Sequence, residues 1–288
     1  MNYYITTDAT GDMPKSFYKD CFRIMQMNYL LDDVLYECSP ESLDYDVFYD
    51  KVKNGSMPTT SLITVDRGKE YFEEILKKGY DILHIAFSSK LSGTYENMVL
   101  AAEQLKPLYP DRKIIVKDSK SASGGEGLLV YKILQKREEG ASIEEAAEYF
   151  DSIRNHINHF FTVEDLFHLF RGGRLSKTAA TVGTMLNLKP VLYVDDEGRL
   201  IPIAKTMGRK PAVRMLADKF FEKSQGYVND TVLISHGSCL AEAEDLAAKL
   251  KAKQPDLNVV IDYIGPVIGS HCGKGVLALF FMGKDREK

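Results

Sequence analysis

Hydroxyl-bearing and glycine residues cluster where a predicted strand passes into a predicted helix. The run SSKLSGTY at residues 88–95 follows an apolar strand predicted over 81–87 and precedes a helix that begins near Gly93. Backbone N–H groups in the first turn of a helix have no partners within the helix, and the helix dipole favours negative charge there. Ser92 and Thr94 add hydroxyl donors. The segment therefore predicts a binding site for an anionic group.

Short strands alternate with helices in the first half of the chain. We predict strands over 3–6, 81–87 and 113–116. Helices are predicted over 66–78, over 93–102 and over 142–155, and a loop over 119–127 leads into another helix that ends at 135. A further helix is predicted to open at Asp12, which would act as its N-cap. Such alternation is typical of a parallel sheet with a ligand crevice at the carboxyl ends of its strands. Asp8 and the segments 88–94 and 118–124 would lie at that edge.

The second half has a different pattern. Strands are predicted over 160–163, 191–194, 200–204, 232–235 and 259–263, several of them with alternating polarity. The predicted fold class is therefore α/β with two domains and the ligand between them. The N-terminal α/β domain, with a mainly parallel sheet, covers residues 1–156, and the C-terminal α+β domain covers residues 157–288.

Composition narrows the class of protein. The chain has 288 residues, 44% of them hydrophobic, and a net charge of −4, which argues against a general nucleic-acid binder. Its four cysteines have no CxxC spacing, so we expect reduced thiols and no metal site. The amino terminus has no basic region followed by an apolar core, and no segment approaches the ~20 apolar residues that span a bilayer. We expect a soluble cytoplasmic protein.

Seven motifs together resemble the DegV family, in order and spacing across essentially the whole chain. They are DATGDMP at 8–14, Thr60-Ser61, SKLSGTY at 89–95, Asp118-Ser119, RGGRLS at 171–176, Leu188-Lys189-Pro190 and GSHCGKG at 269–275. The resemblance implies a non-catalytic carrier that holds one long-chain fatty acid between two domains and has no cofactor. It also implies a partner, a fatty acid kinase, which would phosphorylate the carboxylate of the bound acid (the FakB-like role) for phospholipid synthesis.

The resemblance also implies the ligands of the carboxylate. Thr60, Ser92 and His271 stand where the family places groups near the acid, and Ser61 and the Gly93 amide would assist them. Asp8, Asp118 and Ser119 are expected to support the site rather than to contact the ligand. A carboxylate beside His271 would raise the pKa of the imidazole.

Each of these residues also has a purely structural interpretation. Ser92 could act only as a helix N-cap, and Thr60 and Ser61 could bond only to the backbone of the turn after Pro58. His271, which lies among glycines, could serve packing alone. A different function class also stays open, namely a serine-dependent esterase or acyl transferase with Ser92 as nucleophile and His271 as base. The absence of a G-x-S-x-G motif argues against it, and the absence of a G-x-x-x-x-G-K-[ST] loop argues against phosphoryl transfer by this chain alone.

A basic segment could provide a docking surface. Residues 171–214 contain nine Lys or Arg and three acidic residues in a chain that is acidic as a whole. A solvated face is the simplest interpretation. Arg171 and Arg174 flank two glycines, an arrangement suited to phosphate or an acidic surface, and we expect them to meet the kinase or the anionic headgroups of a membrane surface.

Four positions depart from the family pattern. Ala9 replaces a serine, Leu62-Ile63 replaces Gln-Pro, Lys274 replaces a proline, and Met207 stands where an arginine is common. The missing arginine puts docking to a kinase in doubt. The apolar wall of the site is expected among these residues, although each could equally belong to the core: Phe161, Leu166, Leu169, Phe170, Met185, Leu186, Ile264, Val267 and Ile268.

Overall fold

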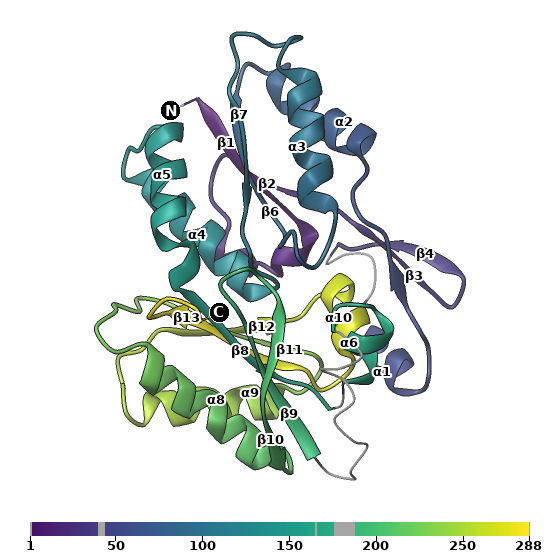
Figure 1. The fold of residues 1–288 in the computed structure, drawn as a ribbon, viewed down its shortest axis with the longest axis vertical. Coiled ribbons are helices and arrows are strands. Elements are labelled where there is room, and N and C mark those ends of the chain that lie inside the picture. Colours follow the sequence, from purple (N-terminus) through teal and green to yellow (C-terminus); the bar gives the residue numbers. More distant parts are fainter. Residues whose placement is uncertain (1, 40–43, 165, 176–187, 288) are drawn as a thin grey trace.

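The computed structural model describes residues 2–39, 44–164, 166–175 and 188–287. These residues form two lobes, each built on its own β-sheet, with a small third sheet projecting from one side (Figure 1). This arrangement confirms the predicted α/β fold class with a parallel sheet and a second, separate sheet.

The first lobe contains a four-stranded parallel sheet, sheet A. Its strands, in spatial order, are β2 (Phe22–Met25), β1 (Tyr3–Asp8), β6 (Asp81–Ala86) and β7 (Ile114–Asp118). One face carries α2 (Val65–Leu76) and α3 (Thr94–Leu105), and the other carries α4 (Gly124–Glu138) and α5 (Ile143–Ile153) (Figure 1). Because the strands are parallel, the ends of β1, β6 and β7 lie at one edge, as predicted.

The small sheet, sheet B, holds one of the predicted site residues. It consists of β4 (Val34–Glu37), β3 (Asn28–Leu31) and β5 (Thr59–Thr60), and α1 (Tyr45–Lys53) packs beside it. Tyr29 and Phe48 join the two elements with ring centroids 5.6 Å apart. These strands are too short to show a clear period in the sequence.

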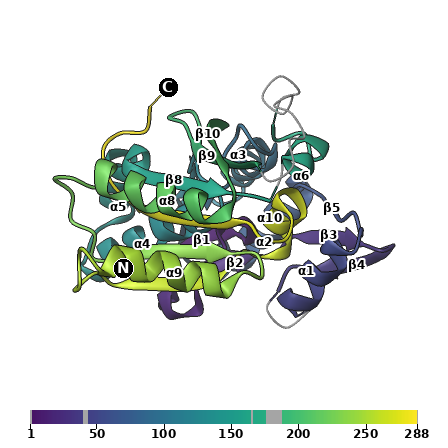
Figure 2. The same cartoon turned by 90° about the horizontal axis from the view of Figure 1, so that it is seen from below.

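The second lobe contains a mixed six-stranded sheet, sheet C. In spatial order its strands are β10 (Leu200–Met207), β9 (Leu188–Val194), β8 (Ile157–Thr162), β13 (Leu277–Met282), β11 (Val232–His236) and β12 (Val259–Tyr263). Two helices, α8 (Arg209–Lys223) and α9 (Leu240–Lys251), cover one face (Figure 2). Two shorter ones, α6 (Phe167–Arg171) and α10 (Pro266–Cys272), lie against each other. The five predicted strands are confirmed, β13 was not predicted, and the boundary at residue 156 stays a prediction.

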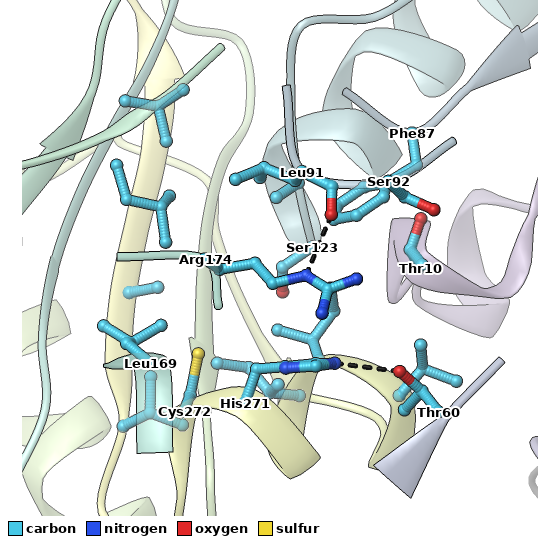
Figure 3. A pocket seen from close by; sticks show the side chains of 18 of the residues that line it. Thr10, Thr60, Phe87, Leu91, Ser92, Ser123, Leu169, Arg174, His271 and Cys272 are labelled. Atoms are coloured by element: carbon cyan, nitrogen blue, oxygen red, sulfur yellow. Dashed lines mark hydrogen bonds between the residues drawn. The ribbon is translucent and has the colours of Figure 1, made fainter. Parts of the chain in front are cut away.

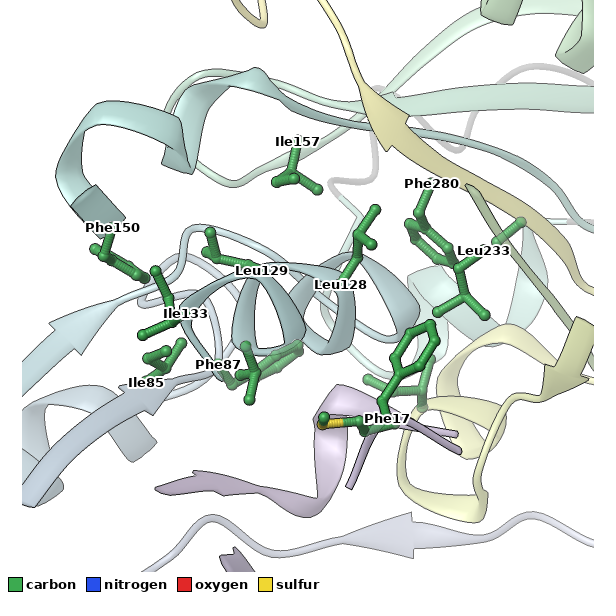
Figure 4. Packing of buried hydrophobic residues seen from close by; sticks show 14 of the residues in the cluster. Phe17, Ile85, Phe87, Leu128, Leu129, Ile133, Phe150, Ile157, Leu233 and Phe280 are labelled. Atoms are coloured by element: carbon green, nitrogen blue, oxygen red, sulfur yellow. The ribbon is translucent and has the colours of Figure 1, made fainter. Parts of the chain in front are cut away.

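Helix α4 joins the two lobes. It is buried almost all round and contacts β1 of sheet A as well as β8, β11 and β13 of sheet C. Leu128, Leu129 and Ile133 lie in the apolar cluster that continues into both lobes (Figure 4). At Gly125 an added Cβ would lie 2.0 Å from His159 Nε2, so the close contact with sheet C requires glycine there.

Two local predictions were wrong. The segment 119–127 is not a loop throughout, because α4 already begins at Gly124, where glycine allows the helix to approach sheet C. Asp12 does not cap a local helix. It ends the 3-10 helix η1 (Ala9–Gly11) with a φ of 38°, and a second 3-10 helix, η2 (Lys15–Phe17), follows. Its carboxylate instead accepts hydrogen bonds from Ser123 and Gly265, which are distant in the sequence.

A third 3-10 helix, η3 (Arg154–His156), connects α5 to β8. Among the described residues, no helix combines the length and apolar character needed to cross a membrane. All four cysteines are free thiols. Lys274 forms an ion pair with Asp50 at 2.5 Å and so connects the loop after α10 to α1.

Candidate functional site

A cavity lies between the two lobes. It contains about 780 Å3 of space free of protein atoms, its open mouth included. Its wall is mostly apolar, and polar side chains gather at one end (Figure 3). Four of the predicted carboxylate ligands line this cavity: Thr60, Ser61, Ser92 and His271.

The centre of the polar end is a contact between Thr60 and His271. The Thr60 hydroxyl lies 2.9 Å from His271 Nε2, although the two residues belong to different elements, β5 and α10 (Figure 3). Both side chains line the cavity. A hydroxyl and a neutral imidazole carry one donor hydrogen each, and their mutual bond uses one of the two, so this pair can donate one hydrogen bond to a carboxylate.

The imidazole of His271 is held neutral. Burial, together with the nearby charges of Arg174 and Arg171, lowers its pKa to about 4. Its Nδ1 atom is buried without a partner among the described residues, and Gly172 lies against it: a Cβ at Gly172 would come within 2.2 Å of Nδ1. The glycine of the Arg-Gly-Gly-Arg motif therefore makes room for the ring.

Ser92 has a local role as well as a place in the cavity wall. Its hydroxyl oxygen accepts the backbone N–H of Thr94 at 3.2 Å and lies 3.0 Å from the Thr94 hydroxyl, just before α3 begins. Ser61 is exposed at the mouth. Gly93 is the N-cap residue of α3 and does not line the cavity, although a Cβ there would come within 3.5 Å of Leu62, which does.

Arg174 also lines the cavity, a position that the sequence did not predict. Its Nε donates to Leu91 O at 2.9 Å (Figure 3). Its Nη1 donates to Gly172 O at 2.5 Å. Burial lowers the pKa of its guanidinium, which still carries its charge at neutral pH. The polar end of the cavity therefore contains a fixed positive charge.

Arg171 also forms hydrogen bonds within the protein, but it does not line the cavity. Its Nη2 donates to Pro58 O at 3.3 Å and to Ser270 O at 3.2 Å, so it joins the segment before β5 to the end of α10. The docking role of Arg171 and Arg174 stays a prediction. Three other basic residues of the 171–214 segment form ion pairs: Lys189 with Glu164, Arg199 with Asp195, and Arg209 with Glu242.

The three predicted supporting residues lie behind the cavity wall. Asp8 caps η1 by accepting the N–H of Thr10 at 3.0 Å, and it also accepts the N–H of Phe87 at 3.0 Å. Asp118 holds two loops instead of capping a helix, since it accepts from Ser89 Oγ at 2.6 Å and Lys120 N at 2.9 Å. Ser119 is buried and bonds to Ser121.

Two buried carboxyl groups, Asp8 and Glu126, lie next to this wall. The Thr7 hydroxyl lies 2.8 Å from Ile85 O and 2.7 Å from Glu126 Oε1, and the Thr10 hydroxyl contacts Glu126 Oε2 at 2.9 Å as well as Asp8. Four such contacts between oxygens need four hydrogens, and the two hydroxyls supply two. We therefore expect a proton on Glu126, which contacts both hydroxyls. In agreement, burial raises the pKa of both groups.

The apolar wall agrees in part with the expected residues. Five of them line the cavity: Phe161, Leu169, Ile264, Val267 and Ile268. Leu166 and Phe170 do not line it, and Met185 and Leu186 lie outside the described residues. Sequence reasoning missed Thr10, Ser123 and His159, which also line it. The first two belong to motifs that were noted, but nothing in the sequence signals that His159 faces this space.

Comparisons with known proteins give one consistent result. A family model described as "Uncharacterised protein, DegV family" matches residues 2–284. A DegV domain-containing protein of Clostridium perfringens is 41% identical over 296 residues, with 99% of each chain covered. The chain is also similar to two solved structures. One is a DegV family protein from Thermus thermophilus described for its fatty acid binding, with 27% identity, a TM-score of 0.86, and coverage of 98% of this chain and 100% of that chain. The other is DegV, a fatty acid binding protein from Bacillus subtilis, with 29% identity, a TM-score of 0.83, and coverage of 99% of this chain and 100% of that chain.

Proposed function

The chain belongs to the DegV family, and on that premise we propose that it binds one long-chain fatty acid in the cavity between its lobes. The observation that carries this proposal is the division of one cavity into an apolar wall and a polar end, where Thr60, Ser92, Arg174 and His271 meet. Two solved relatives are described as fatty acid binding proteins, which supports it.

The polar end matches the needs of a carboxylate. A carboxylate that enters a buried site loses its hydration and needs several donors in return. The Ser92 hydroxyl and the Thr60–His271 pair can each donate one hydrogen bond, and Arg174 supplies the opposite charge. The same guanidinium would suit a phosphate group on that carboxylate.

The apolar wall supplies affinity. Burial of about 15 methylene groups at roughly 0.8 kcal/mol each contributes on the order of 12 kcal/mol before the costs of ordering and association are subtracted. The polar end then fixes the orientation of the ligand, with its carboxyl group toward the mouth, where Ser61 is exposed.

We further propose that the protein presents this carboxyl group to a fatty acid kinase and is itself the non-catalytic partner. This role belongs in the cytoplasm, where the four free cysteines stay reduced. Contact with a membrane surface would be transient, and we expect no nucleic-acid partner. Met207, where the family commonly has an arginine, is 69% exposed at the end of β10, so it is available to a partner surface.

The alternative, a serine esterase or acyl transferase, has less support. It requires His271 to take the proton of Ser92, but among the described residues Ser92 bonds to Thr94 and His271 bonds to Thr60. A ring with a pKa of about 4 is a weak general base at neutral pH. No carboxylate orients its Nδ1, which has no partner in the described structure.

Mass spectrometry of the extracted protein tests the proposal. The purified chain would be denatured, extracted with organic solvent and analysed for bound lipid, and delipidated protein would be titrated with palmitate. We expect about one fatty acid per chain and saturable palmitate binding. A protein that neither retains nor binds a fatty acid, but hydrolyses p-nitrophenyl esters only while Ser92 is intact, would establish the esterase instead.

A further inference from the structure

Asp12 connects the two lobes directly behind the cavity wall. Its Oδ1 accepts the backbone N–H of Gly265, the N-cap residue of α10, at 2.8 Å. Its Oδ2 accepts the hydroxyl of Ser123, the N-cap residue of α4, at 2.6 Å. Ser123 lines the cavity between the lobes, hereafter the lipid cavity. Its backbone has a φ of 52°, a value that L residues rarely adopt. A bound ligand therefore lies one side chain away from this carboxyl group.

A second cavity reaches Asp12 from the opposite side. It contains about 910 Å3 of space free of protein atoms, opening included, and Asp12 lines it together with Asp262, Tyr45 and Tyr263. Tyr18 also lines this cavity and is 40% exposed, so the space reaches the protein surface. Asp12 thus lies between the lipid cavity and an aqueous space from which it can exchange protons.

The surroundings of Asp12 disfavour its charged form. Burial raises its pKa to about 7, and the like charges of Asp262 and Asp8 act in the same direction, whereas the bonds from Ser123 and Gly265 oppose them. Several titratable groups face it from the neighbouring elements: Asp8 of β1, Lys15 of η2, Tyr18 after η2, Cys38 after β4, Tyr45 and Tyr49 of α1, Glu126 of α4, Asp262 and Tyr263 of β12, and Cys272 of α10. Lysine is the only cation among them, and it is exposed.

We propose that Asp12 takes up a proton from the second cavity when a fatty acid anion binds. This inference rests on the proposed function. The ligand adds a negative charge and drives water out of the lipid cavity, and both changes favour the neutral carboxyl group. Binding and protonation are therefore linked, so that affinity falls as the pH rises above 7, by up to about tenfold per pH unit where uptake is complete.

Calorimetric titration with palmitate tests the linkage. Delipidated wild-type protein would be titrated at pH 7.5 in two buffers of different ionisation enthalpy, which gives the number of protons taken up, and affinities would be measured from pH 6 to 8.5. We expect net uptake by the wild type and none by Asp12→Asn. Asp262→Asn is the matched control: it keeps the uptake but moves its midpoint to lower pH, because it removes a like charge.

Each outcome decides one question. Proton uptake that persists in Asp12→Asn overturns the proposal, and if His271→Gln abolishes that uptake, the imidazole is the acceptor. Binding without uptake by the wild type also overturns it. If Asp12→Asn does not fold, as judged by circular dichroism, the midpoint of Asp262→Asn decides: a shift to lower pH supports the proposal and an unchanged midpoint overturns it. No palmitate binding by the wild type at any pH contradicts the proposed function instead.

Discussion

Thr60 and His271 are separated by 211 positions in the sequence, yet the Thr60 hydroxyl and His271 Nε2 lie 2.9 Å apart in the wall of the cavity. Sheet B brings the threonine to this place and α10 brings the histidine. We propose that this pair binds the acidic group of the ligand, and the following experiments test that role.

Replacing Thr60 by valine should weaken fatty acid binding. Valine keeps the shape of the side chain but removes the hydroxyl, and with it the hydrogen bond that the Thr60–His271 pair would donate to the carboxylate. A hydrogen bond to such a charged group contributes about 1.5–3 kcal/mol, or roughly ten- to a hundredfold in affinity. Palmitate titration of the delipidated variant measures this loss. Thr59→Val, at the exposed neighbouring position, should bind like the wild type. Equal affinities for the two variants would remove Thr60 from the site.

Replacing Gly172 by alanine should displace the imidazole. The φ of Gly172 is −71°, so alanine fits the backbone, but its Cβ would lie 2.2 Å from His271 Nδ1. We expect a loss of fatty acid affinity of at least about tenfold and a loss of about 1–3 kcal/mol in the free energy of unfolding, as in other overpacked sites. Calorimetry and chemical denaturation measure the two effects. Unchanged affinity would show that the ring position is not required.

Replacing Glu126 by glutamine should change how stability depends on pH. The pKa of Glu126 is raised in the folded protein, so the folded state keeps a proton that the unfolded state releases above about pH 4.5. Above that pH the free energy of unfolding falls by about 1.4 kcal/mol per pH unit, until the pKa of the folded state is reached. Glutamine removes this contribution. Chemical denaturation at pH 5.5, 6.5 and 7.5 should therefore show a shallower slope for the variant.

The matched control for that experiment is Glu138→Gln, an exposed change on the same helix, which should keep the wild-type slope. If Glu126→Gln also keeps it, the carboxyl group is ionised in the folded protein and the proton count derived from the threonine contacts fails.

Replacing Met207 by arginine should strengthen docking to a fatty acid kinase. Met207 is exposed, and an arginine there could pair with an acidic group of the partner, a contribution of about 0.2–1 kcal/mol for an exposed pair. Acyl phosphate formation in a reconstituted system with the kinase of a related organism should rise up to about fivefold at limiting kinase. Met207→Leu serves as the control, and palmitate affinity should stay unchanged in both. Equal rates would exclude this position from the docking surface.

The sequence predicted much of the fold because its main elements are local patterns. The buried strand β6 and the capping box of α5 follow from residues that are adjacent in the chain. The prediction for Asp12 failed for the opposite reason: its carboxylate accepts from Gly265, 253 residues away, and no local pattern encodes that partner.

In the candidate site, too, local motifs could be predicted from the sequence and distant contacts could not. Motifs indicated Thr60, Ser92 and His271, all of which line the cavity. The position of Arg174 depends on how Gly172 packs against the imidazole, which is a property of the folded chain.

Helix α4 sets the route by which a bound molecule can leave. This helix contacts sheet A on one side and sheet C on the other. Separating the lobes as rigid bodies would expose the apolar surface of one side of the helix to water, at a free-energy cost of about 25 cal/mol for each Å2 exposed. We therefore expect a bound fatty acid to exchange through local motion around the mouth of the cavity. The residence time of the cargo is then a property of the entrance and not of the overall stability of the protein.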